Sequence, residues 1–107
     1  MVTGPVQVDL PDFCKVIRVE TAIEMQEAAL NSGDYDIAIF VAAVGDWRVK
    51  NIPNKKIKKT EGEPPPKLDL IENPDIIKTV CALKNRPELV IGFAAETENV
   101  IENAKKK

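Results

Sequence analysis

Residues 35–44, YDIAIFVAAV, decide the fold of this chain, because residues 37–44 form an unbroken run of eight apolar side chains. Several of these side chains are β-branched, and apolar and polar residues do not alternate. That pattern is typical of a central parallel strand covered on both faces. A second run, LVIGFAA at residues 89–95, predicts another strand of the same kind. The chain is therefore expected to build a sheet around these two strands.

Upstream of the first run, the pattern predicts a strand over residues 13–19 and a helix over residues 22–31. Thr21 and Glu24 have the spacing of a capping box, in which each side chain accepts a backbone N–H from the other residue. Gly33 follows where a left-handed residue commonly ends a helix. Residues 1–2 are the tail of a further strand.

Between the two apolar runs the pattern is less regular. Residues 50–67 contain several prolines and a lysine-rich stretch, and Leu68 and Leu70 indicate a short edge strand. Asn73 and Pro74 predict the start of a helix, with asparagine as the N-cap and proline in the first turn.

Thr97 is the expected N-cap of a last helix, which would run to Lys107. The predicted order is strand, helix, strand, irregular basic segment, helix, strand, helix. This alternation favours an α/β fold with a mostly parallel sheet. At 107 residues the chain is at most one domain, covering residues 1–107.

Composition excludes several classes of function. The chain has 15 lysines and arginines against 17 acidic residues, a net charge of −2 that is unlike a dedicated binder of duplex nucleic acid. It has no histidine, so histidine triads and histidine metal sites are excluded. No apolar run is long enough to span a membrane, and residues 1–5 do not resemble a signal peptide. Cys14 and Cys81 are predicted to be reduced core residues of a cytoplasmic protein.

Two strand ends carry residues that could bind a ligand, because ligands of open α/β sheets bind beyond the carboxyl ends of the strands. One end runs from Val44 to Arg48 and includes Asp46, and the other runs from Gly92 to Thr97. Together they predict a crevice that accepts phosphates. The alternative is a solvated loop at Asp46 and close packing of small residues at the other strand end.

The basic run is the third candidate. Four lysines surround Ile57, and on an acidic chain such a cluster indicates phosphate groups as the ligand. The alternative is an exposed loop, or an edge strand whose lysines block further strand pairing.

Six motifs occur in the order found in one known family. The chain resembles phosphopantothenate–cysteine ligases, the synthetase half of the bifunctional coenzyme A biosynthesis flavoproteins, also described as the DNA/pantothenate metabolism flavoprotein family. The motifs are TGPV at 3–6, VETAIEM at 19–25, AAVGDWR at 42–48, KIKK at 56–59, ENPDI at 72–76 and GFAAET at 92–97. The resemblance covers nearly the whole chain and implies a Rossmann-like three-layer fold, truncated at both ends.

The resemblance also implies a reaction. In this family the carboxylate of 4′-phosphopantothenate attacks the α-phosphorus of CTP, which gives an acyl-cytidylate and pyrophosphate. The amine of cysteine then displaces CMP, and Mg²⁺ assists the first step. The chemistry requires cations and backbone N–H groups that offset the repulsion between a carboxylate and a polyanion.

The resemblance assigns roles to particular residues. Asp46 would lie near the reacting centre or its metal, although no metal ligand set is implied. Four residues would bind the cytidine nucleotide: Phe93, Ala94, Thr97 and Lys107. A basic segment consisting of Lys56, Lys58 and Lys59 would close toward the substrate phosphates or toward a dimer partner.

The chain also departs from the family pattern. The family begins this domain with a glycine-rich nucleotide loop, an arginine and an asparagine, none of which precedes Met1. It usually has Ala-Asp-Tyr-Arg where Gly45 to Arg48 stand here. We therefore expect a fragment, a subdomain or one piece of a split gene product, inactive as a ligase by itself. It would work as a homodimer or with a complementary polypeptide that supplies the missing loop. The alternative is a non-catalytic module of the same fold that binds nucleotides or anions, or that serves dimerisation.

Overall fold

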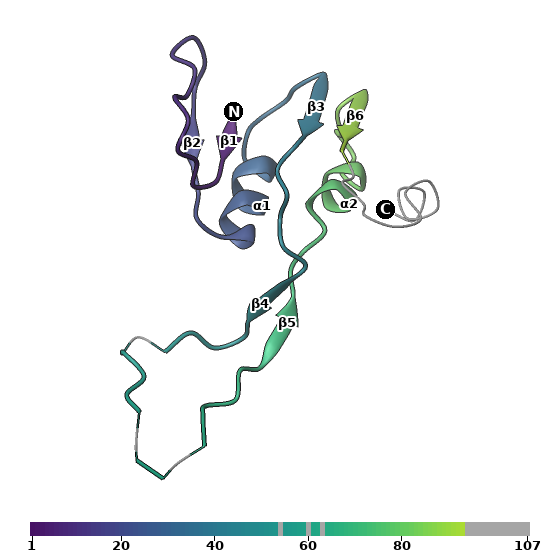
Figure 1. Ribbon diagram of the computed structural model, residues 1–107. Coiled ribbons are helices and arrows are strands. Elements are labelled where there is room, and N and C mark those ends of the chain that lie inside the picture. The colour runs from purple at the N-terminus through teal and green to yellow at the C-terminus, as the bar shows by residue number, and fades with distance from the viewer. Residues whose placement is uncertain (54, 60, 63, 94–107) are drawn as a thin grey trace.

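The structure is a computed structural model that describes residues 1–53, 55–59, 61–62 and 64–93 (Figure 1). Within these residues, strands and helices follow one another as the apolar runs predict. The elements are β1 (Val2–Thr3), β2 (Ile17–Arg18), α1 (Ala22–Leu30), β3 (Ile37–Phe40), β4 (Trp47–Val49), β5 (Leu70–Glu72), α2 (Ile76–Cys81) and β6 (Leu89–Gly92).

The strands pair in twos. β1 pairs with β2 and β3 pairs with β6, both in parallel, whereas β4 and β5 are antiparallel. Helix α1 packs on β1 and on α2, and α2 packs on β6, so the two helices form one layer. The predicted α/β class with parallel strands is confirmed.

Helix α1 begins at the predicted capping box. The Thr21 hydroxyl accepts the Glu24 N–H at 3.2 Å, and the Glu24 carboxylate accepts the N–H groups of Glu20 at 2.7 Å and Thr21 at 3.1 Å. These bonds, the one from Glu20 first, lower the pKa of Glu24 below its ordinary value of 4.5. The helix ends with Asn31 as C-cap, and Gly33 then has φ +84°, the left-handed conformation predicted for it.

Several predicted boundaries are wrong. The strand predicted over residues 13–19 is limited to β2, which pairs with the short β1. The predicted order of elements does not include β4, because polar residues return after Val44 and no strand pattern follows. The strand exists because β5 lies opposite: Trp47 pairs with Glu72 and Val49 with Leu70.

The N-cap of α2 is Asp75 and not the predicted Asn73. The Asp75 carboxylate accepts the Lys78 N–H at 2.9 Å, and its backbone is extended, with φ −76° and ψ 100°. Asn73 cannot fill that role because its side chain bonds to Gly45 and Arg48 instead.

One face of the β3–β6 pair packs against α2. A Cβ atom at Gly92 would lie 3.1 Å from Ile77 Cδ1, so the even-numbered side of the pair faces that helix. Ala38, on the same side, is buried. On the other side Ile37 and Ile39 are 55% and 61% exposed. The prediction that both faces of these strands are buried is therefore wrong for the described residues, which cover one face only.

The buried core is small, and a long extension projects from it. Of the described residues, the buried apolar ones are Val19, Ala38, Ile76 and Val80. We call β4, β5 and the residues between them, 47–72, the arm (Figure 1). It contributes to a radius of gyration of 17.6 Å, compared with about 13 Å for a compact domain of this length.

Two smaller expectations are also resolved. Cys14 and Cys81 are both free thiols, but both are exposed, so their predicted place in the core is wrong. The neighbouring Val80 fills the core position on α2 instead. Within the part of the chain that the structure describes, neither helix has the length and apolar character that crossing a bilayer would require.

Candidate functional site at the carboxyl ends of β3 and β6

The two central strands end side by side. Phe40 is in register with Gly92, and the Phe93 N–H donates to the Phe40 carbonyl at 3.2 Å, which continues the ladder by one residue. The Phe93 side chain is 68% exposed at this edge, on the side of the pair away from α2. An exposed aromatic ring at a strand end can stack on a base. Three other predicted nucleotide-binding residues, Ala94, Thr97 and Lys107, lie outside the described residues.

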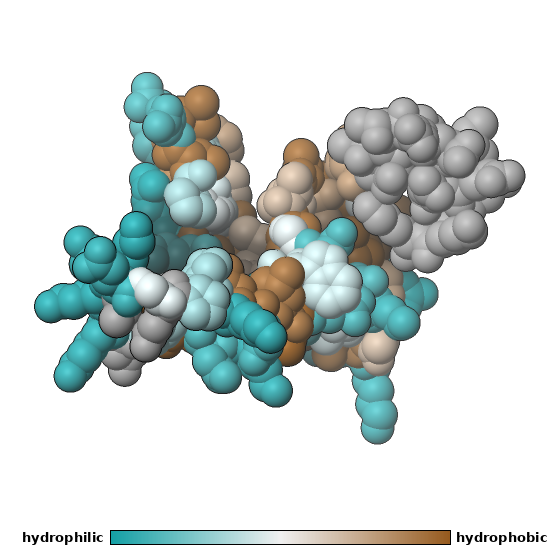
Figure 2. Space-filling model, turned by 60° about the horizontal axis from the view of Figure 1, so that its bottom comes forward, coloured by the Kyte–Doolittle hydropathy of each residue, from teal (hydrophilic) through white to brown (hydrophobic). Residues whose placement is uncertain are grey.

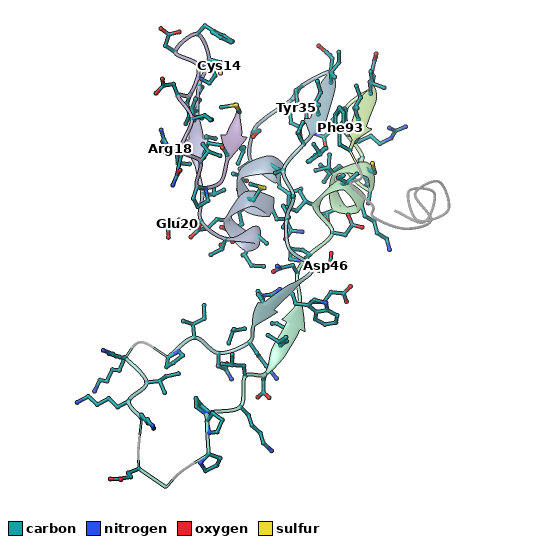
Figure 3. All side chains as sticks on the ribbon, in the orientation of Figure 1. Cys14, Arg18, Glu20, Tyr35, Asp46 and Phe93 are labelled. Carbon is teal, nitrogen blue, oxygen red and sulfur yellow. The ribbon has the colours of Figure 1, made fainter. Side chains whose placement is uncertain are left out.

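Asp46 lies where the chain turns from the β3–β6 body into the arm (Figure 3). Its backbone carbonyl accepts the Asn73 N–H at 2.7 Å, and the residue itself is exposed. In Figure 3 Phe93 lies at the carboxyl ends of β3 and β6, whereas Asp46 lies farther along the chain, next to the start of β4. Strand β3 ends at Phe40, six residues before Asp46, so the crevice between Asp46 and the β6 end stays a prediction.

Sequence analysis assigned no binding role to Asn73, which lies at the same place and contacts Arg48 of the predicted strand end. The Asn73 amide donates from Nδ2 to the Gly45 carbonyl at 2.7 Å, and its Oδ1 accepts from Arg48 Nη1 at 3.2 Å. Arg48 Nη1 also donates to the Glu72 carbonyl. The ENPDI motif contains Asn73, but its spacing predicts only a helix cap. The sequence does not reveal that the partner of Asn73 is Gly45, 28 residues away.

Lys56, Lys58 and Lys59 do not join this site. They lie in the loop at the far end of the arm, and all three are exposed (Figure 1). The same end of the arm is predominantly hydrophilic in Figure 2, whereas apolar surface gathers over the body. The lysines can thus meet phosphates at the strand ends only if the arm bends back, or if it serves another subunit.

A hollow occurs in a different part of the described residues. It lies at the amino-terminal edge of β3 and is lined by Leu30, Gly33, Asp34, Tyr35, Leu83, Asn85 and Pro87. The Asn85 amide donates to Asp34 at 3.1 Å there, so two of the polar groups satisfy each other. None of the predicted site residues lines it. We place the candidate site at the carboxyl edge of β3 and β6 because of the residue types there, and not because the surface is deep there.

Known proteins are similar to this chain in sequence and in fold. The family model for the DNA/pantothenate metabolism flavoprotein C-terminal domain matches residues 1–107, and the chain belongs to this family. It is 44% identical over 111 residues to the coenzyme A biosynthesis bifunctional protein CoaBC of Escherichia coli K12. It is also 44% identical over 108 residues to the protein of the same name from Haemophilus influenzae. Each match covers 100% of this chain.

A solved structure has the same fold. The crystal structure of the C-terminal domain of CoaBC matches with a TM-score of 0.72 and 34% identity, covering 99% of this chain and 47% of that one. This match confirms the Rossmann-like class. The chain spans about a quarter of the length of the curated relatives it matches, 27% for the Escherichia coli protein.

Proposed function

We propose that this chain forms the core of a CTP-dependent phosphopantothenate–cysteine ligase that acts in coenzyme A biosynthesis. The observation that carries the proposal is the 44% identity to a coenzyme A biosynthesis protein over the whole chain. The adjacent carboxyl ends of β3 and β6 support it, because that edge is where α/β folds bind nucleotides.

The proposed reaction has two steps. A carboxylate oxygen of 4′-phosphopantothenate forms a bond to the α-phosphorus of CTP, and pyrophosphate leaves. The cysteine amine then bonds to the acyl carbon, loses a proton, and CMP leaves. In this scheme Phe93 stacks on the nucleotide. Ala94, Thr97 and Lys107, which follow Phe93 in the sequence, also bind the nucleotide. Asp46 lies beside the phosphates, and the lysines of the arm offset negative charge.

Magnesium fits these residues as a partner of the nucleotide. Mg²⁺ is commonly held by one or two carboxylates and the substrate phosphates, and Asp46 offers one exposed carboxylate at this edge. No group of three or more candidate ligands occurs among the described residues. Substrate phosphates and water molecules would supply the other ligands of the ion. When bound, the ion would neutralise phosphate charge.

Two measurements test the proposal. Calorimetric titration with CTP and Mg²⁺ should detect weak binding by this chain, and Phe93→Ala should weaken it while Phe13→Ala, an exposed phenylalanine in the loop before β2, should not. Pyrophosphate release from CTP, phosphopantothenate and cysteine should be absent with the chain alone. It should appear when a polypeptide carrying the glycine-rich loop is added. Indifference to every nucleotide would remove the proposal.

A second candidate function is assembly, as a homodimer or with a complementary polypeptide. The arm favours assembly, because three apolar side chains are exposed along it: Ile52, Ile57 and Leu68. Apolar side chains on a projecting ribbon commonly pack on a partner. Light scattering should give a dimer mass for this chain. Removing the three lysine charges should lower that mass if the basic segment pairs with the partner, and an unchanged mass would argue against that role.

A further inference from the structure

Asn73 closes the root of the arm through three hydrogen bonds, all to residues on the opposite chain segment. Its backbone N–H donates to the Asp46 carbonyl at 2.7 Å, and its Nδ2 donates to the Gly45 carbonyl at 2.7 Å. Its Oδ1 accepts from Arg48 Nη1 at 3.2 Å. Asn73 is half-buried although its neighbours Asp46 and Glu72 are exposed.

The amide group is suited to this position. It offers donors and an acceptor on one short uncharged side chain, and here the donor and the acceptor are used on two different residues. Alanine would lose both bonds, and aspartate would keep only the acceptor. A ribbon of two short strands is marginally stable by itself. Contacts at its root therefore fix its direction.

Asn73 is also connected to the other half of the site. Pro74, with its fixed φ, and Asp75, the N-cap of α2, follow it directly. Helix α2 then places Ile77 against Gly92, the residue before Phe93. The segment that carries Asp46 is thus hydrogen-bonded to Asn73, two residues before the N-cap of the helix that contacts the end of β6.

We propose that Asn73, with Arg48, is a positioning residue that holds Asp46 at a fixed place relative to the end of β6. The ligand side of this inference is a nucleoside triphosphate held between Asp46 and the end of β6, and it rests on the proposed function. The geometric side does not, because it concerns only how firmly residues 45–48 are held against residue 73.

The geometric side is tested by amide hydrogen exchange on the full chain. Asn73→Ala should raise the exchange rate of the residue-73 amide about 10- to 100-fold, the effect of losing two side-chain hydrogen bonds, and Asn73→Asp should give a smaller increase. The Ala82 amide, which donates to Lys78 within α2, should be unaffected. Trp47, the single tryptophan, should show faster local motion in its fluorescence anisotropy decay. Asn51→Ala, an exposed asparagine on the arm, is the matched control.

The ligand side is tested by titrating the same variants with CTP and Mg²⁺. Asn73→Ala should weaken binding about tenfold, and Asn51→Ala should match the wild type. If the wild type binds no CTP, the proposed function fails, and the exchange data still decide the geometry. An exchange rate of the residue-73 amide that is the same in Asn73→Ala as in the wild type would overturn the inference. Equal loss of protection in α2, or an unchanged CTP affinity with faster exchange, would overturn it as well, because either result denies a positioning role.

Discussion

Replacing Gly92 with valine should separate helix α2 from the sheet and displace Phe93. A Cβ atom at residue 92 would lie 3.1 Å from Ile77 Cδ1, about 0.4 Å inside the closest comfortable carbon–carbon separation. Alanine requires only that the end of a flexible side chain rotates, and the loss of unfolded-state freedom favours it by about 0.4–1 kcal/mol. We therefore expect Gly92→Ala to be close to neutral.

Valine adds two methyl groups at the same place, and Ile77 cannot clear both by rotation. Overpacking of this kind costs about 1–3 kcal/mol of the free energy of unfolding. Ile77→Val removes Cδ1 itself, at a cost of about 0.5–1.5 kcal/mol. In the double variant the added valine meets less resistance. The two costs should therefore sum to more than the measured loss, by about 1 kcal/mol.

Urea unfolding followed by far-ultraviolet circular dichroism measures all four members of this cycle. Gly45→Val is the control, because a Cβ atom at Gly45 meets nothing within 4 Å and stability should change by less than about 0.5 kcal/mol. Strict additivity of the Gly92 and Ile77 variants would refute the reasoning, since it would mean that the two side chains do not compete for the same space.

Four further variants test the fold and the site. Thr21→Ala should lower the free energy of unfolding by about 0.5–2 kcal/mol in urea titrations, because α1 loses its N-cap. The lowered pKa of Glu24 stabilises the fold above pH 4.5, and this contribution should be lost as the pH falls through the folded-state pKa; Glu24→Gln should flatten that part of the profile, and an unchanged slope would contradict the assignment. Val80→Ala, at a fully buried position, should cost about 2–3 kcal/mol, whereas a loss below about 0.5 kcal/mol would place Val80 outside the core. Phe93→Ala should lower CTP affinity by about 1–3 kcal/mol in calorimetry, and equal affinity for the variant and wild type would exclude base stacking.

The features that could be predicted from the sequence are local ones. The capping box depends on two residues three positions apart, and the left-handed Gly33 depends on its own lack of a side chain. The pairing of β3 with β6 follows from two apolar runs that prefer parallel neighbours. In each case the information lies within the segment or in the pattern that it repeats.

The features that could not be predicted depend on a distant partner. Trp47 and Arg48 follow the point at which polar residues return after a long apolar run. They form a strand only because Leu70 to Glu72 lie opposite. Asn73 has the spacing of a helix cap, but the nearby Gly45 carbonyl and Arg48 guanidinium bind its amide first. Continuous apolar runs predicted cover on two sides, yet the described residues supply helices for one side only.

The uncovered side of β3 and β6 has a practical consequence. Ile37, Ile39 and Val41 present a flat apolar row to solvent, and β3 has no second strand neighbour among the described residues. Such a surface favours edge-to-edge association of further copies, so association beyond the dimer should increase as the concentration of the chain rises. Coexpression with a polypeptide that shields this row would keep the chain dispersed, whereas a solubility tag at a distant terminus would only delay precipitation.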